Sequence, residues 1–177
     1  MLKMLYFYTS KLRMNNLHLK FCSILFGLFF LLSCERDDIC IVSVTESPDL
    51  IVLMLDAEDL TRKKTPSNFS IRAIGSPNPL PSIFNDSLKL PLKIQENITQ
   101  FEFIQNEGSE NQNIDTIQIN HKRFDSFINA ACGYRSNFIL EATPIIILNP
   151  GNNWVQGFTI LKDTISDETR AHLGILH

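Results

Sequence analysis

Apolar residues recur along residues 50–104 in short runs and in alternation with polar residues, a pattern that predicts β-strands. Residues 50–55 are continuously apolar, as expected of a central strand covered on both faces. Residues 69–74, 88–94 and 98–104 alternate, as half-buried strands do. Pro91 interrupts one of these segments and predicts an edge strand or a bulge there.

The same pattern continues to the end of the chain. Five further strands are predicted, at residues 114–121, 132–140, 145–148, 154–161 and 171–176. Polar or Pro/Gly-containing turns separate several of them, and residues 123–131 could hold one short helical turn. Without a sustained helical period, these strands predict an all-β, immunoglobulin-like β-sandwich of about 7–9 strands. A closed barrel is the alternative.

The first 33 residues have the three parts of a signal peptide. A polar stretch with Lys20 precedes an apolar run from Phe21 to Leu32, and Ser33 precedes Cys34. As a helix, this run would span about 18 Å, whereas a bilayer core is about 30 Å thick. We therefore expect a signal-peptide helix rather than a membrane anchor, with Met14 as a possible true start.

Residues Leu31-Leu32-Ser33-Cys34 resemble the lipobox of bacterial lipoproteins. The resemblance implies cleavage before Cys34 and a diacylglycerol thioether on its sulfur, which would hold the mature chain on a membrane. Residues 34–41 would then be a lipidated acidic spacer, and residues 42–177 a single sandwich domain.

The acidic run Glu35-Arg36-Asp37-Asp38 is similar to the signal that sends Bacteroidota lipoproteins to the cell surface. The alternative is a soluble spacer. The expected location is the cell envelope, with the outer membrane favoured and the face of that membrane left open.

The composition, 44% hydrophobic and 20% charged, is ordinary for one globular domain. Residues 1–33 hold four basic residues and no acidic ones, so residues 34–177 hold 12 basic and 19 acidic residues, a net charge of −7. Nucleic-acid binding is not expected, because phosphate binding needs clustered cations.

Two cysteines remain after Cys22 leaves with the signal and Cys34 takes the lipid. Cys40 and Cys132 are an even pair in an oxidising compartment and predict a disulfide, with two buried free thiols as the alternative. No metal site or other cofactor is predicted, because two lone cysteines do not complete a ligand shell.

Several short segments resemble a family of uncharacterised Bacteroidota lipoproteins that contain a domain of unknown function. These segments are Cys34-Glu-Arg-Asp-Asp-Ile-Cys40, Leu88-Lys-Leu-Pro-Leu92, Asp115-Thr116, Ala131-Cys132-Gly133-Tyr134 and Ala171-His172-Leu173. The resemblance implies an envelope lipoprotein without an assigned activity, and it supplies no catalytic residues.

Three positions resemble the O-glycosylation sequon of the same phylum, Asp followed by Ser or Thr and an aliphatic residue. The candidate acceptors are Ser87, Thr116 and Thr164. The alternative is that a polar pair before an apolar residue merely starts a strand.

Few residues suggest a ligand site. Trp154 follows a Pro/Gly turn where a ligand platform could sit, although an aromatic lid over the core is the alternative. His121 and His172 are expected at the surface rather than as metal ligands. Asp56 and Glu58 could form a carboxylate pair beside a strand end, but acids near turns are usually just solvated.

Two functions remain from the sequence. The first is a non-catalytic envelope module that binds another protein or a glycan such as peptidoglycan. The second is an accessory hydrolase acting on envelope polysaccharide or peptidoglycan, which would need two acids and an aromatic cleft to converge. No catalytic residue is predicted, and the first function is favoured.

Overall fold

The computed structural model divides the chain into two units, Met1–Ile39 and Cys40–His177. It describes residues 20–21, 25–26, 40, 45–81, 87–149 and 151–177. In the first unit the described residues are helical and exposed. Among all described residues, no helix is long and apolar enough to cross a membrane. The predicted cleavage site and Cys34 lie outside the described residues.

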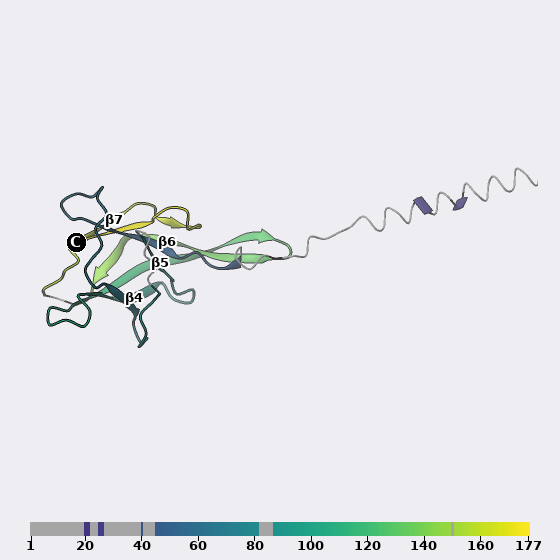
Figure 1. Cartoon of the computed structure of the whole chain (residues 1–177). Coiled ribbons are helices and arrows are strands. Elements are labelled where there is room, and N and C mark those ends of the chain that lie inside the picture. Colours follow the sequence, from purple (N-terminus) through teal and green to yellow (C-terminus); the bar gives the residue numbers. More distant parts are fainter. Residues whose placement is uncertain (1–19, 22–24, 27–39, 41–44, 82–86, 150) are drawn as a thin grey trace, which may run out of the picture. The chain divides into compact units, whose positions relative to one another are not determined.

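The second unit is a β-sandwich, which confirms the predicted fold class (Figure 1). One sheet has the strand order β3-β1-β9-β7 and the other has the order β2-β4-β5-β6-β8. The strands are β1 Leu50–Leu55, β2 Ser70–Ala73, β3 Ser87–Leu90, β4 Ile98–Gln105, β5 Asn113–Asn129, β6 Gly133–Ile147, β7 Gly157–Ile160, β8 Thr164–Ile165 and β9 Leu173–Leu176.

Strand β1 is the buried interior strand that its continuous apolar sequence predicted. It pairs antiparallel with β3 and parallel with β9, so the first and last strands of the sandwich are neighbours. Leu50 and Val52 are 0% exposed. Parallel pairing without an intervening helix is possible here because almost the whole sandwich lies between the two strands in the sequence.

Strand β3 is an edge strand, as Pro91 predicted. The ladder with β1 ends at Leu90, one residue before the proline, which has no N–H to donate. The pattern therefore gave the correct edge position, although the strand is shorter than residues 88–94.

The core lies between the two sheets. In β4, Thr99, Phe101 and Phe103 face inward and are at most 4% exposed, whereas Ile98 is 41% exposed. The core consists mainly of Leu50, Val52, Leu88, Leu90, Phe101, Phe103, Ile117, Ile119, Phe138, Ile165, Leu173 and Ile175.

The helical turn predicted for residues 123–131 is wrong. β5 continues as a strand to Asn129 and pairs with β6, with Phe127 opposite Tyr134. Phe124 and Phe127 are spaced as on one side of a helix, but both lie on β5, because β6 pairs with this segment and Gly133, at φ +72°, closes the hairpin.

Strand β6 joins two predicted strands, 132–140 and 145–148, into one. The register with β5 shifts between Ile119 and His121, opposite the stretch of β6 that contains Pro144. This irregularity allows a proline inside a long strand. The short strand β8 was not predicted, since it contributes only Thr164 and Ile165.

Candidate functional site

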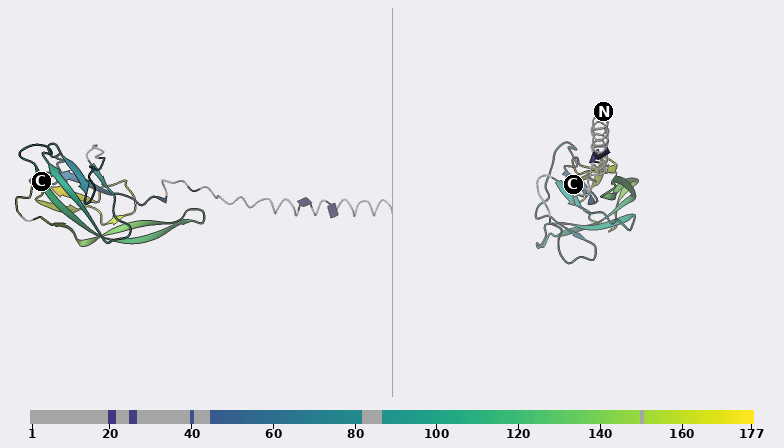
Figure 2. Two further views of the ribbon diagram at one scale, coloured as in Figure 1. Left: turned by 90° about the horizontal axis from the view of Figure 1, so that it is seen from below. Right: turned by 90° about the vertical axis from the view of Figure 1, so that its right-hand side faces the viewer.

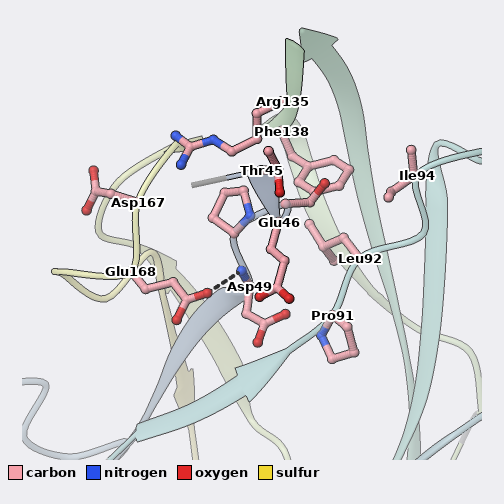
Figure 3. A pocket seen from close by; sticks show the side chains of 12 residues that line it. Thr45, Glu46, Asp49, Pro91, Leu92, Ile94, Arg135, Phe138, Asp167 and Glu168 are labelled. Carbon is pink, nitrogen blue, oxygen red and sulfur yellow. Dashed lines mark hydrogen bonds between the residues drawn. The ribbon is translucent and has the colours of Figure 1, made fainter. Parts of the chain in front are cut away.

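A cavity of about 810 Å³ is lined by four acidic residues, Glu46, Asp49, Asp167 and Glu168 (Figure 3). We call it the acidic pocket. It forms where the segment leading into β1, the chain after β3 and the loop between β8 and β9 approach β6. It is lined by Thr45, Glu46, Ser47, Pro48, Asp49, Pro91, Leu92, Ile94, Arg135, Phe138, Asp167 and Glu168.

Glu168 links two sides of the acidic pocket. Its Oε1 accepts the backbone N–H of Asp49 at 3.0 Å, and its Oε2 pairs with the Lys89 ammonium at 2.6 Å. Burial raises the pKa of Glu168, but these two donors outweigh that effect and lower the pKa overall. Glu168 is therefore an anion at neutral pH.

The Asp49 carboxyl behaves in the opposite way. Burial raises its pKa, and the negative charges of Glu168 and Glu46 raise it further, while Lys89 opposes them. No described residue donates a hydrogen bond to this carboxylate. Asp49 is thus a partly buried carboxyl group that lies beside the anionic Glu168 without a hydrogen-bond donor among the described residues.

Arg135, on β6, and Asp167, in the loop between β8 and β9, flank the pocket. Lys162 lowers the pKa of Asp167 through a 2.8 Å contact, with further hydrogen bonds from Thr169. Arg135 donates to the Ser166 carbonyl at 2.7 Å, and its buried Nε has no partner among the described residues. This edge of the pocket therefore carries both signs of charge.

Trp154 lies mainly in the core. It is 8% exposed, its indole N–H donates to the Phe103 carbonyl at 3.2 Å, and its ring contacts Phe69 and His177 edge-on. The ring also lines a smaller recess of about 340 Å³. Its N–H is therefore already bound within the fold.

The prediction that His121 and His172 lie at the surface is wrong, since both are 0% exposed. His121 Nε2 lies 2.9 Å from the Thr99 hydroxyl, and the ring packs against Phe138. His172 Nδ1 accepts the Ile51 N–H at 3.0 Å. His121 continues the odd-numbered inward positions of β5, so its burial could have been found from the alternation.

Asp115 is a buried carboxylate that the sequence reasoning did not single out as structural. It is 0% exposed and accepts the Val155 N–H at 2.8 Å and the Asn153 amide at 2.9 Å. It thereby fixes the turn before β7 onto β5. The signal for its burial was again the inward alternation of β5.

The three candidate glycosylation acceptors are all half-buried. Ser87 and Thr164 lie on the edge strands β3 and β8, whereas Thr116 lies on β5 between two strands. Edge strands leave one side free of a neighbouring strand. Modification stays a prediction, and the two edge positions are the better placed acceptors.

Asp56, considered from the sequence as half of a carboxylate pair with Glu58, is ion-paired with Arg62 in the structure. Asp56 is buried, and its pKa is lowered by the Glu58 backbone N–H and by an ion pair with Arg62, while Lys64 lies 3.7 Å away. Glu58, by contrast, is exposed. Across the described parts of the chain, no group of three or more His, Cys, Asp or Glu residues is arranged to hold a metal ion.

The predicted disulfide is present. Cys40 is bonded to Cys132, with 5.1 Å between the two Cα atoms. Cys132 lies in the turn of the β5–β6 hairpin, so the bond fastens the start of the second unit to the end of its longest hairpin.

Residues 77–177 match a family described as a family of unknown function (DUF6452). The match covers more than half of the chain, and its described part contains β3 to β9. No curated protein matches the chain. No solved structure matches it. The chain belongs to this family of unknown function.

Proposed function

We propose that the mature chain is an envelope lipoprotein, attached to the outer membrane through lipid on Cys34, whose β-sandwich is a non-catalytic binding module. The lipobox at Leu31–Cys34 supports the attachment. The disulfide between Cys40 and Cys132 supports an oxidising compartment outside the cytoplasm.

The acidic pocket is the observation that carries the binding role. Glu168 and Asp167 have lowered pKa values and are anionic at neutral pH, while Asp49 has no described hydrogen-bond donor. A cationic group entering the pocket would form a charge-assisted hydrogen bond with Asp49 and offset its poor solvation. The chemistry therefore favours an envelope protein that presents a lysine or arginine side chain.

The test compares partners co-isolated with the full chain from native membranes. We expect Asp49→Asn to reduce the yield of a stoichiometric partner by about tenfold, the effect of losing roughly 1.4 kcal/mol from a charge-assisted bond. Glu110→Gln is the matched control, because Glu110 is an exposed acid in the β4–β5 loop, outside the pocket lining. An unchanged partner yield with Asp49→Asn would remove the pocket from the proposal.

An accessory hydrolase of envelope polysaccharide or peptidoglycan is the second candidate. The observation that favours it is the opposite direction of two pKa shifts in one pocket, raised at Asp49 and lowered at Glu168. Such a difference is typical of an acid and a base that act together. Release of soluble fragments from purified peptidoglycan by the wild type, lost in Asp49→Asn, would support the hydrolase over the binding module.

A further inference from the structure

The β5–β6 hairpin extends beyond the rest of its sheet (Figure 2). β4 pairs with β5 only as far as Asn120, and β8 pairs with β6 only at Phe138 and Ile139. Among the described strands, the outer part of the hairpin pairs only with itself. A two-stranded ribbon of this kind buries little apolar surface, so its side chains are available for contacts outside the domain.

The end of the hairpin is apolar and uncharged. Residues 127–134, Phe-Ile-Asn-Ala-Ala-Cys-Gly-Tyr, contain no acidic or basic side chain, and we call this segment the hairpin tip. Tyr134 is 69% exposed and Phe127 60%, which makes them the most exposed large hydrophobic residues described in the second unit. Their rings lie edge to face with 5.4 Å between centroids, so the tip presents one aromatic surface.

The nearest charged side chain on β5 is already neutralised. Arg123 and Asp125 form an ion pair at 2.6 Å. On β6, the Arg135 guanidinium donates to a backbone carbonyl of the chain. The tip itself can therefore leave water without carrying a charge of its own with it.

The covalent structure limits how far the hairpin tip can lie from the lipid. The disulfide places Cys40 and Cys132 5.1 Å apart at their Cα atoms. The six residues from Cys34 to Cys40 span at most about 22 Å when fully extended. If Cys34 carries diacylglycerol in a bilayer, the tip is confined to the zone next to the headgroups.

We propose that the hairpin tip inserts into the headgroup region of the membrane that holds Cys34, with Phe127 and Tyr134 as the inserted side chains. This inference rests on the proposed lipid attachment. Aromatic side chains are enriched at membrane interfaces, where their apolar rings are buried and a polar end such as the Tyr134 hydroxyl stays hydrated. The lipid and the tip would give the sandwich two points of attachment and hence a defined orientation.

The test measures the depth of a tryptophan placed at the tip. Phe127→Trp and Tyr134→Trp lipoproteins are purified from native membranes and reconstituted into vesicles of phosphatidylethanolamine and phosphatidylglycerol with acyl chains brominated in part of the lipid. The wild type corrects for Trp154. We expect bromine to reduce the added emission by about half or more, because interfacial side chains reach about 5–10 Å into the headgroup–acyl boundary.

Leu60→Trp is the control. Leu60 is 53% exposed in the loop after β1, and hydrogen bonds from Ala57 and Lys64 to the His177 carbonyl tie this loop to the C terminus. The C terminus lies at the end of the domain away from the hairpin (Figures 1 and 2). The emission of the tryptophan in Leu60→Trp should therefore be unaffected by brominated lipid.

Flotation of the vesicles separates the two claims. Protein that floats with the vesicles but shows no quenching at positions 127 and 134 overturns the insertion and leaves the lipid attachment intact. A second copy of the chain covering the tip would give this result together with a dimer. Protein that does not float overturns the lipid attachment and, with it, the insertion.

Discussion

Residues His121 and His172 show how buried polar side chains are accommodated in this sandwich. Each ring has one nitrogen within hydrogen-bond distance of a described group, and the other, His121 Nδ1 or His172 Nε2, has no partner in the described structure. Burial lowers the pKa of both imidazoles, and Lys162 lowers the pKa of His172 further. Both histidines are therefore neutral in the folded protein at pH 7.

This burial makes stability depend on pH. The unfolded chain binds protons at these histidines below about pH 6.5, whereas the folded chain does not until its lowered pKa values are reached. We expect the free energy of unfolding to fall on acidification from pH 7 to 5, by up to about 1.4 kcal/mol per pH unit for each histidine.

Urea unfolding at several pH values measures this slope. His172→Asn offers an amide oxygen to the Ile51 N–H and should flatten the slope, because it removes one titrating group. His121→Gln should flatten it independently. Stability that is constant or rises between pH 7 and 5 in the wild type would contradict the account.

At the scale of elements, the pattern of apolar and polar residues predicted a strand correctly where the sequence of that strand alone determines its position in the sheet. It predicted β1 from its apolar run and the edge position of β3 from Pro91, because burial and the missing N–H act locally. It failed at residues 123–131, where the strand is formed by pairing with β6 rather than by its own periodicity. The acidic pocket could not be predicted either, since it joins Asp49 to Glu168, which are distant in the sequence.

The disulfide joins the start of the second unit to the turn of the β5–β6 hairpin. Cys40 and Cys132 are separated by 92 residues, and in the chain-entropy model closing such a loop stabilises the fold by about 4–5 kcal/mol. The double variant Cys40→Ser/Cys132→Ser should lose a large part of this stabilisation. Adding a reductant should not change the denaturant midpoint of the variant. Equal denaturant midpoints for the variant and the oxidised wild type would show that the disulfide does not stabilise the fold.

At the scale of the whole molecule, the first 33 residues differ from the rest of the chain in net charge and in cysteine pairing. The first 33 residues are basic and apolar, and the remainder carries a net charge of −7 together with the paired cysteines. This division is consistent with the proposed export of the chain to an oxidising compartment. The proposed binding at the acidic pocket and the proposed insertion of the hairpin tip both assume that Cys34 is attached to a membrane.

Membrane fractionation of cells labelled with palmitate tests that attachment most directly. The account predicts that the wild type is labelled and sediments with membranes, and that Cys34→Ala is unlabelled. A wild type that takes up no palmitate, with Cys34→Ala still in the membrane fraction, would contradict it.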